Sequence, residues 1–442
     1  MTTLQIVIIT VSAFIGLSLV GIIVYLIWPQ PYPSKTESDY TYHHSPWWQI
    51  YYSHKYLRPK RRAEKSSGLE AYFKGLDFRF SQPDDADDSE RLIIGAVGDL
   101  MCRKDMLGEG HKYLWNDVGR SLFHSDLTIG NLEFPVNPDW YILKLLRFSV
   151  SGEYAEPLLG DGRHGKFDVL SLGNNHMNDS LHAGVVGTRD YLDKKAIANT
   201  GANRTKEEQD EVLIVEKKGV RIAVLSYSFS TNGVPFEKGK EFGVNVVRFN
   251  ALNDEDYDPS LILRHIEIAK AKGADYIISC HHWGIDLEFY PPSRIVKRAH
   301  DLMDAGVDLI IGHHSHVIGQ IDRYKTKDGR DTLIFYSLGN FTAAGLPFAV
   351  QRLGAMAHVT LRVTEKDGRN TVSPEQVTFT PMLFTVAERD GTASCEVLQV
   401  NREKVRSIKN LELTRSQQME LAKVTDIFEK NFRNKDNGII YQ

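Results

Sequence analysis

The sequence predicts a layered α/β domain preceded by one N-terminal transmembrane helix. From residue 91 onward, short apolar runs alternate with amphipathic helical stretches, which is typical of sheets covered by helices. At the N-terminus, residues 4–28 contain no charged side chain and are strongly apolar. The composition, 42% hydrophobic and 25% charged, is that of a globular protein rather than a disordered or fibrous one.

The apolar N-terminal stretch is long enough to cross a bilayer. A helix rises about 1.5 Å per residue, so roughly 20 such residues span the hydrocarbon core. No Lys or Arg precedes the run, and Tyr25, Ile27 and Trp28 close it, unlike the basic leader and small-residue cleavage site of a signal peptide. We therefore expect a membrane anchor over residues 1–28 rather than a buried core helix. Because Lys35 is the first cation after it, the positive-inside rule slightly favours a cytoplasmic C-terminal domain.

Residues 29–90 have the composition of an aromatic and polar linker. Three prolines follow the apolar run directly, and Tyr and Trp residues gather at positions 40–52. This aromatic stretch suits either the membrane interface or an irregular arm that packs on the domain, and both interpretations remain open. The acidic run at residues 84–88 indicates a solvated loop before the first core strand.

The main domain is expected at residues 91–350, followed by a β-rich extension with a closing helix at residues 351–442. The apolar runs that predict strands lie at residues 92–97, 127–129, 167–172, 222–225, 276–278, 307–311 and 333–336. Amphipathic helices are expected at residues 261–271 and 295–304. In the extension, residues 357–363 and 377–379 have strand character, and a polar helix is expected at residues 414–431.

Charge and cysteine content exclude some classes of protein. The formal net charge of −4 gives no indication of a nucleic-acid partner. Cys102, Cys280 and Cys395 form no C-x-x-C pair and no disulfide framework, so the fold must depend on an ordinary apolar core. Cys102 and Cys280 lie beside polar clusters but in no nucleophile motif, and we interpret them as small buried residues.

Six of the apolar runs end in polar residues of the kinds that bind metals. In sheets of this type, ligands bind beyond the carboxyl ends of the strands, so the clusters should meet at one edge. The triplet His313, His314 and His316 is the most specific single signal, with purely structural histidines as the alternative. The clusters are Gly98-Asp99, Gly130-Asn131-Leu132-Glu133, Gly173-Asn174-Asn175-His176, His281-His282-Trp283-Gly284, Gly312-His313-His314-Ser315-His316 and Gly339-Asn340-Phe341.

This mixture of oxygen and imidazole ligands suits Mn²⁺, Fe²⁺ or Zn²⁺ better than Ca²⁺, which prefers oxygen alone. A cation at such an edge could polarise a phosphoryl or carbonyl oxygen and lower the pKa of a bound water. A neighbouring imidazole could give a proton to the leaving group. The sequence therefore predicts a centre for one or two divalent cations.

The same clusters, together with Leu100-Met101 and Ser337-Leu338, occur in the order seen in the CapA family, which is linked to poly-γ-glutamate capsule synthesis. The chain resembles that family over roughly residues 92–345. The resemblance implies a membrane-anchored domain outside the cytoplasmic membrane, which opposes the charge-based preference for a cytoplasmic domain. It also implies an anionic polymer and other capsule-synthesis membrane proteins as partners.

The CapA domain in turn is similar to a divergent calcineurin-like phosphoesterase, which implies a layered metallophosphoesterase-like α/β sandwich. This similarity implies that His176 is the general acid or phosphate-binding imidazole, and that His313 and Asn340 lie near the substrate. Which of His313 and His314 pairs with His316 as a ligand is left open. The implied metal ligands are Asp99, Glu133, Asn175, His282, His314 and His316.

Two departures from the phosphoesterase pattern put the number of cations in doubt. Met101 stands where that family has a ligand His, and Asn131 replaces the usual Asp of the second motif, leaving Glu133 as the nearby carboxylate. We expect a role in making or exporting an anionic capsular polymer through a metal-dependent hydrolase site. The alternatives are a non-catalytic polymer-binding or assembly subunit with a relic metal site, and a stand-alone metal-dependent phosphoesterase.

Overall fold

The computed structural model describes residues 21, 59–80, 89–139, 142–144, 147–343, 349–366, 368–433 and 436–442. The expected anchor and the aromatic stretch at residues 40–52 lie outside these residues, apart from Gly21. Within the described ranges, no helix has both the length and the apolar character needed to cross a membrane.

The larger of two main sheets has ten strands among the described residues, with the order β18-β17-β16-β1-β2-β7-β8. Strands β1, β2, β7 and β8 are parallel, whereas β16, β17 and β18 continue the sheet in antiparallel pairs. Strand β15 pairs with β1, and β19 and β20 pair with β17. The bounds are β1 (Glu90–Leu100), β2 (Leu127–Leu132), β7 (Val169–Ser171), β8 (Ala198–Thr200), β15 (Asn340–Thr342), β16 (Leu353–Lys366), β17 (Arg369–Arg389), β18 (Thr392–Gln399), β19 (Leu411–Glu412) and β20 (Ile440–Tyr441).

The second main sheet has six strands in the described part of the chain, in the order β13-β14-β12-β11-β10-β9. Its central strands β10, β11, β12 and β14 are parallel. The bounds are β9 (Leu213–Lys217), β10 (Val220–Ser228), β11 (Tyr276–His282), β12 (Leu309–His313), β13 (Ile321–Lys325) and β14 (Asp331–Phe335). Two small hairpins are β3 (Ile142–Lys144) with β4 (Arg147–Ser149) and β5 (Gly160–Asp161) with β6 (Gly165–Lys166).

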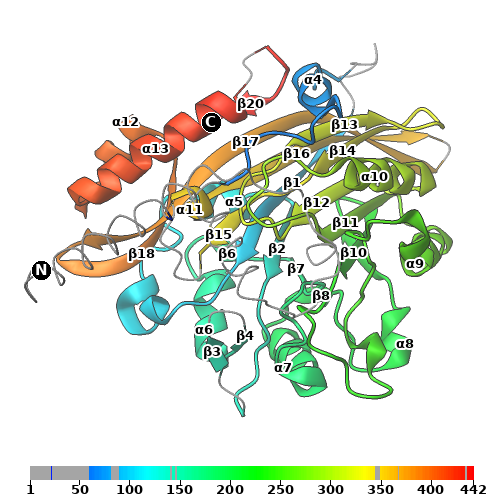
Figure 1. The fold of residues 1–442 in the computed structure, drawn as a ribbon, viewed down its shortest axis with the longest axis horizontal. Helices are drawn as coiled ribbons and strands as arrows, with labels where there is room; N and C mark the ends of the chain where they lie inside the picture. Colours follow the sequence, from blue (N-terminus) through cyan, green and yellow to red (C-terminus); the bar gives the residue numbers. More distant parts are fainter. Residues whose placement is uncertain are drawn as a thin grey trace, which may run out of the picture.

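The two sheets pack face to face, and helices cover their outer faces (Figure 1). Ile94 on β1 and Ile278 on β11 belong to the apolar layer between the sheets. Successive side chains of a strand point to opposite faces, so the preceding residue of β11, Ile277, lies in the outer cluster that also contains residues of α9 and α10. The expected layered α/β architecture is thus confirmed. The helices are α4 (Leu69–Lys74), α5 (Gly119–Phe123), α6 (Gly152–Ala155), α7 (Leu181–Lys194), α8 (Lys206–Gln209), α9 (Ser260–Ala271), α10 (Ser293–Ala305), α11 (Ala349–Arg352), α12 (Arg402–Ser407) and α13 (Arg415–Asn431).

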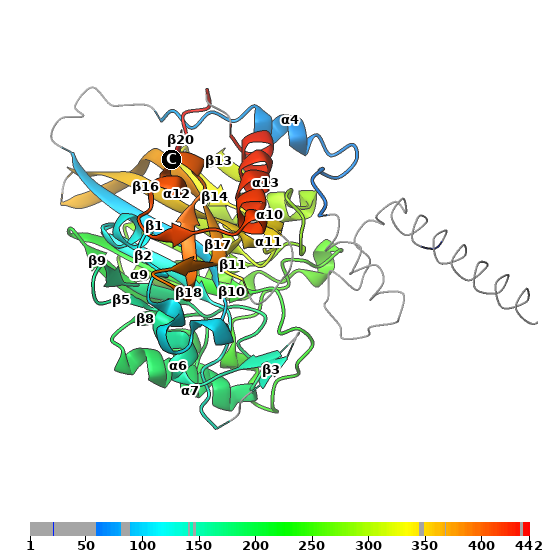
Figure 2. The same ribbon diagram turned by 90° about the vertical axis from the view of Figure 1, so that its left-hand side faces the viewer.

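Residues after 353 extend the larger sheet. Strand β16 runs antiparallel to β1 from Glu90 opposite Val363 to Val97 opposite Met356. Helix α13 occupies the range where the sequence predicts a closing helix and lies along β17 (Figure 2). Its first turn is fixed by a capping box between Thr414 and Gln417.

Residues 59–80, from the segment expected as a linker, form an arm on the surface of the domain. Helix α4 buries Leu69 and Phe73 against the core. The Tyr72 hydroxyl donates a 2.7 Å hydrogen bond to Asp322 on β13, and Lys60 forms a β-bridge with Glu288. The described part of this segment is therefore packed on the domain, whereas the aromatic stretch at residues 40–52, for which two interpretations remain open, lies outside the described residues.

Candidate metal centre

The carboxyl ends of parallel strands from both main sheets meet at one place, as the sequence predicts. Asp99 lies near the end of β1, Glu133 directly follows β2 and His176 follows β7 in the larger sheet. His282 and His313 are the last residues of β11 and β12 in the smaller sheet, where they are register neighbours. The site thus takes side chains from both main sheets.

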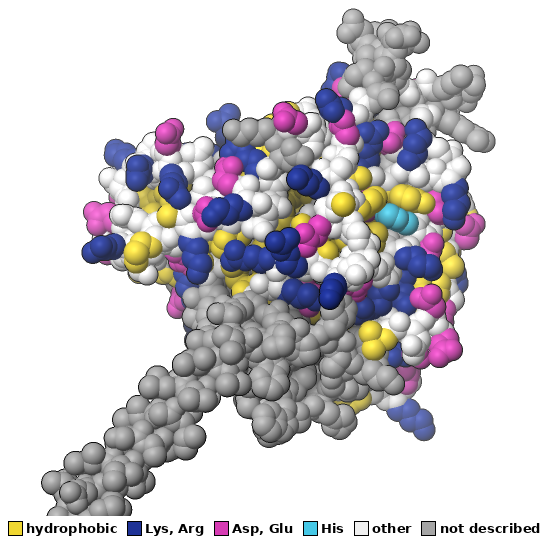
Figure 3. Space-filling model, turned by 45° about the horizontal axis from the view of Figure 1, so that its top comes forward, with side chains coloured by type: hydrophobic (Ala, Val, Ile, Leu, Met, Phe, Trp, Pro, Cys, Tyr) yellow, Lys and Arg dark blue, Asp and Glu magenta, His cyan; other side chains and the backbone are white. Residues whose placement is uncertain are grey.

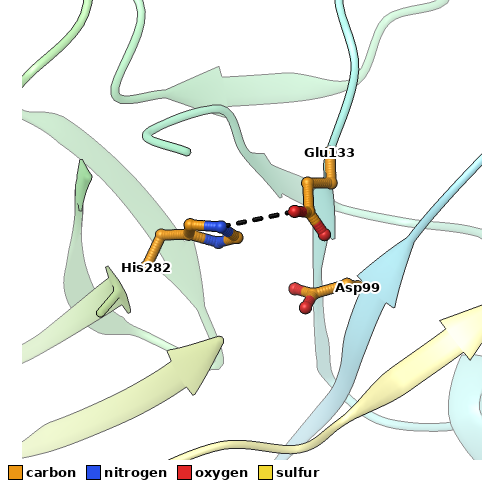
Figure 4. Close-up of side chains that lie close together, drawn as sticks. All are labelled: Asp99, Glu133 and His282. Atoms are coloured by element: carbon orange, nitrogen blue, oxygen red, sulfur yellow. Dashed lines mark ion pairs between the residues drawn. The ribbon is translucent and has the colours of Figure 1, made fainter. Parts of the chain in front are cut away.

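Asp99, Glu133 and His282 form the centre of this site (Figure 4). Each offers one ligand atom, and these three atoms lie within 4.8 Å of one another. Nε2 of His282 is 3.4 Å from Oε1 of Glu133, and both side chains are completely buried. Burial lowers the pKa of His282 well below its usual value, so its imidazole is neutral, the form that binds metals.

Glu133 has no hydrogen-bond donor for either carboxylate oxygen among the described residues. Burial, and after it the charge of Asp99, raises the pKa of Glu133 to about 8. A buried carboxylate without donors is costly, and a cation is the usual means of compensating it. Two carboxylates with a neutral imidazole are a suitable donor set for Mn²⁺, Fe²⁺ or Zn²⁺. The residues at the centre therefore fit a divalent metal.

Asp99, in contrast, is well supplied with donors. Asn131 Nδ2 donates to its Oδ1 at 2.8 Å, and the backbone N–H of His314 donates to its Oδ2 at 3.2 Å. Burial raises the pKa of Asp99, but the hydrogen bond from His313 and the neighbouring imidazoles outweigh burial, and the pKa is below its usual range. Gly98 is needed just before it, because a Cβ there would lie 1.9 Å from the backbone oxygen of Gly339.

The end of β12 and the histidine-rich turn that follows it bring three imidazoles to the site, those of His313, His314 and His316. Nδ1 of His313 lies 3.1 Å from Oδ1 of Asp99, and Nε2 of His314 lies 3.4 Å from Oδ1 of Asp286. Nδ1 of His316 donates to Oδ1 of Asn340 at 2.8 Å and lies 3.5 Å from Asp99. His314 and His316 have φ angles of 92° and 54°, in the left-handed region that non-glycine residues rarely occupy. Such strain is common at functional sites.

His176 lies at the side of the site next to Glu133. Its Nδ1 donates to Oδ2 of Asp179 at 2.7 Å, and its Nε2 is 4.0 Å from Oε1 of Glu133. Burial lowers the pKa of His176, but Asp179 outweighs burial, and the pKa is raised overall. Asp179 therefore orients this imidazole and favours its protonated form.

The two asparagines singled out in the sequence line the same site. Nδ2 of Asn175 donates to Oδ1 of Asn232 at 3.0 Å, while Asn175 Oδ1 is buried with no donor in the described part of the chain. Asn340 connects the site to α11, since its Nδ2 donates to the backbone oxygen of Gln351 at 2.7 Å. Among the described residues, hydrogen bonds join the side chain of Asn175 to that of His176 only through Asn232, whose Nδ2 lies 3.4 Å from Nε2 of His176.

Sequence reasoning missed Asp286, Asp179 and Asn232. Asp286 follows His282 by four residues in the same loop, and Asp179 follows His176 by three, so a search for carboxylates just downstream of each cluster could have found both. Asn232 comes after the carboxyl end of β10, which lies beside β11. Its strand ends in no conspicuous cluster, so the sequence offered no comparable signal.

Four residues next to the clusters lie outside the site. His281 points away from His282, forms a 2.7 Å hydrogen bond with Ser279 and stacks on Phe249. Trp283 donates to the backbone oxygen of Tyr336 at 3.1 Å and packs against the ring of His281. Met101 and Cys102 belong to the apolar cluster on the outer face of the larger sheet. Burial raises the pKa of Cys102 to about 12, so its thiol stays protonated.

The fold and the site together define a layered α/β protein with a candidate metal centre at the meeting edge of its two sheets. The profile of the family described as bacterial capsule synthesis protein PGA_cap matches residues 93–344, more than half of the chain. The chain belongs to this family, as the resemblance to CapA proteins implied.

Two curated relatives carry matching descriptions. The capsule biosynthesis protein CapA of Bacillus anthracis is 30% identical over 270 residues, covering 58% of this chain and 60% of that protein. The PGA biosynthesis protein CapA of Bacillus subtilis is 34% identical over 261 residues, covering 57% of this chain and 63% of that protein. The matches therefore span less than two thirds of either relative. The solved structure of the calcineurin-like phosphoesterase YfkN from Bacillus subtilis aligns with 15% identity and a TM-score of 0.38, covering 78% of this chain and 98% of that one.

Proposed function

We propose that this chain acts in the synthesis or export of an anionic capsular polymer such as poly-γ-glutamate, through a metal-dependent hydrolase site. Membership of the PGA_cap family and the descriptions of the two CapA relatives support the polymer pathway. The observation that carries the hydrolase site is the buried Glu133 carboxylate, which has no donor in the described part of the chain and lies beside Asp99 and His282.

Each group at the site has a distinct role in this proposal. Asp99, Glu133 and His282 hold one cation of the Mn²⁺, Fe²⁺ or Zn²⁺ type, and His316 completes its surroundings, with Nε2 3.8 Å from Glu133. Such a cation polarises a phosphoryl or carbonyl oxygen when bound. His176, oriented by Asp179, gives a proton to the leaving group. Asn175 and Asn340 supply amide groups for the substrate and for the imidazole of His316.

The proposal places this domain at the outer face of the cytoplasmic membrane. The uncharged apolar run at residues 4–28 supports an anchor, and the resemblance to CapA proteins supports an extracytoplasmic domain. Other membrane proteins of capsule synthesis would then be its partners.

A second candidate function is a non-catalytic polymer-binding or assembly subunit. Met101 favours it, because this side chain is buried in the apolar cluster of the outer face and supplies no ligand where phosphoesterases have a histidine. The buried carboxylate of Glu133 favours the hydrolase. Keeping a carboxylate buried without a hydrogen-bond donor costs stability, and a bound cation would compensate that cost.

Metal content tests the hydrolase site. The full chain, purified in detergent after exposure to Mn²⁺, Fe²⁺ or Zn²⁺, is expected to hold about one or two ions. Asp99→Ala and His282→Ala should lose ions, while His281→Gln, the adjacent imidazole that faces away, should keep them. Circular dichroism would establish that each variant is folded, and hydrolysis of a phosphoester and of poly-γ-glutamate would follow. Folded wild-type protein that holds no metal in any condition would contradict the hydrolase and would favour the non-catalytic subunit.

A further inference from the structure

A cavity of about 410 Å³ lies away from the metal centre. It is lined by β8, the edge strand of the larger sheet, by β9, the edge strand of the smaller sheet, and by residues of α7, α8 and α9 (Figure 1). Ligand pockets have volumes of about 300–1,000 Å³, so a small ligand fits this space. None of the described residues that line the cavity belongs to the metal centre.

Two neighbouring residues of the cavity wall each have a polar atom without a hydrogen-bond partner. Nη1 of Arg189 donates to the backbone oxygen of Asn199 at 3.1 Å, which holds the two residues together. Among the described residues, Nε of Arg189 is buried with no acceptor and Oδ1 of Asn199 is buried with no donor. Nδ2 of Asn199 donates to the backbone oxygen of Ile197 at 3.1 Å, which fixes the orientation of this amide. The wall thus offers a cationic donor beside a neutral acceptor.

The positive charge of Arg189 is only partly compensated. Oε2 of Glu208 is 3.7 Å from Nη2 of Arg189, and Glu208 already accepts hydrogen bonds from the backbone N–H and Nε of Arg204 at 2.7 and 2.8 Å. Burial lowers the pKa of Arg189, and the nearby carboxylates offset only part of this effect. Lys272 brings a second cation to the cavity, whereas the acidic residue Glu211 is exposed. A bound anion would therefore compensate buried positive charge.

We propose that this cavity binds a γ-glutamyl unit of an anionic polymer, with the carboxylate of the unit on Arg189 and its amide N–H on Asn199. In a γ-glutamyl chain the carboxylate and the amide nitrogen are attached to the same carbon, which matches a cationic donor next to an amide acceptor. Arginine is well suited to carboxylates, because its N–H groups form charge-assisted hydrogen bonds with them. This inference rests on the polymer of the proposed function but not on its metal.

The cavity and the metal centre are connected through buried polar groups. Strand β8 pairs with β7, and residues 172–176 lead from the end of β7 to the metal centre. Nδ2 of Asn245, in the cavity wall, donates to the backbone oxygen of Ser226 at 3.2 Å, and Ser226 Oγ accepts from the N–H of Gly173 at 2.9 Å. A polymer held in the cavity would therefore have a raised effective concentration at the metal centre.

Binding of a short γ-linked oligoglutamate to the full chain in detergent and EDTA tests this inference. EDTA removes metal, so binding at the cavity is measured without a cation at the metal centre. We expect wild-type binding to persist, and Arg189→Gln to bind at least about tenfold more weakly because it loses a charge-assisted hydrogen bond. The matched control is Arg264→Gln, which removes the same charge on α9, where Arg264 pairs with Asp210 at 2.8 Å outside the cavity. It should bind like the wild type.

A second ligand tests the same contact without a variant. An oligomer whose carboxylates are converted to amides should bind the wild type at least about tenfold more weakly. Calorimetry would give the affinities, and circular dichroism would establish that each variant is folded. Equal affinity of the wild type and folded Arg189→Gln, or an equal loss in Arg264→Gln, would overturn the inference. Orthophosphate that competes as tightly as the oligomer would also overturn it, since the cavity would then take a free anion.

The metal dependence of binding separates this inference from the proposed function. Binding that is lost in EDTA and restored by Mn²⁺ would place the polymer at the metal centre alone, which overturns the inference and supports the proposed hydrolase. Binding in EDTA by a chain that holds no metal in any condition would contradict the hydrolase and support the inference. A wild-type chain that binds no oligomer with or without Mn²⁺ would overturn the inference together with the polymer of the proposed function.

Discussion

At the scale of single residues, hydrogen-bond donors decide how a buried carboxyl titrates. Asp99 and Glu133 are both completely buried and lie in the same site. Asp99 receives several donors and has a lowered pKa, whereas Glu133 receives none in the described chain and has a pKa of about 8. Burial alone would have raised both values.

Glu396 on β18 offers a test of the same principle away from the site. Burial raises its pKa to about 7, against the opposing effect of Arg389, which lies 3.2 Å away. Because the folded chain binds this proton more tightly than the unfolded chain, the contribution to stability is full below pH 4.5 and is lost as the pH rises through 7. The loss amounts to about 3 kcal/mol at most.

We expect Glu396→Gln to remove this part of the pH dependence. Chemical denaturation between pH 5 and 8 should show a steeper decline in the free energy of unfolding for the wild type than for the variant. Glu388→Gln, an exposed position on neighbouring β17, should leave the wild-type slope unchanged. Parallel curves for wild type and Glu396→Gln would contradict the raised pKa.

Several site residues could be predicted because they directly follow apolar runs. Asp99, His282 and His313 end or nearly end their strands, so the apolar pattern of the sequence is enough to place them at the sheet edge. Asp286 and Asn232 lie further along their loops, where the path of the backbone depends on tertiary contacts. Their positions therefore could not be derived from strand periodicity.

At the scale of elements, the amphipathic helices α9 and α10 were predicted nearly at their observed bounds. Helix α7 was not, because its sequence contains Gly184 and Gly187, which lower helix propensity. The fold needs both small residues: a Cβ at Gly187 would lie 2.6 Å from the backbone oxygen of Val136, and one at Gly184 would lie 2.0 Å from Ser180 Oγ. The small residues that close packing requires in α7 therefore weakened the helical signal in its sequence.

The arm at residues 59–80 is predicted to steady the loop that carries Asp286. The N–H of Lys60 donates to Leu287 at 3.0 Å, and the N–H of Phe289 donates to Lys60 at 3.1 Å. Lys60→Pro removes the first donor, a loss of about 1 kcal/mol, so amide exchange in residues 284–290 should become roughly fivefold faster. Hydrogen exchange with mass spectrometry would measure it.

Lys60→Ala is the matched control, since it keeps the backbone N–H and removes only the side chain near Glu288. Exchange in the loop should then stay close to that of the wild type. Equal acceleration in both variants would assign the steadying effect to the side chain, and no acceleration in either would mean that the loop does not depend on the arm.

At the scale of the whole molecule, the extension after residue 350 is part of the core. Strand β16 covers one edge of β1, and Val359 and Leu361 belong to the apolar layer between the sheets. The sequence indicated strands in this region but gave no pairing partner, since register depends on contacts far apart in the chain. On the face shown in Figure 3, basic and acidic side chains are interspersed.

Truncation after residue 350 should therefore prevent folding. The loss of β16 and β17 would expose the edge of β1 and much of the apolar layer, which favours aggregation. The soluble fraction and gel filtration would measure the effect. A chain ending at residue 433 keeps β16, β17 and α13 and should remain soluble. A soluble, monodisperse 1–350 chain would show that the extension is dispensable.

The division of the site between two sheets has a mechanical consequence. Asp99 and Glu133 lie at the carboxyl ends of strands in one sheet, and His282 lies at the end of a strand in the other. The distances between these groups therefore depend on the relative position of the two sheets. A cation that binds ligands from both sheets would hold the sheets together and would stabilise their packing by the free energy of its binding. Substitutions deep in the apolar layer between the sheets would then alter metal affinity, even where the substituted residue contacts no metal ligand.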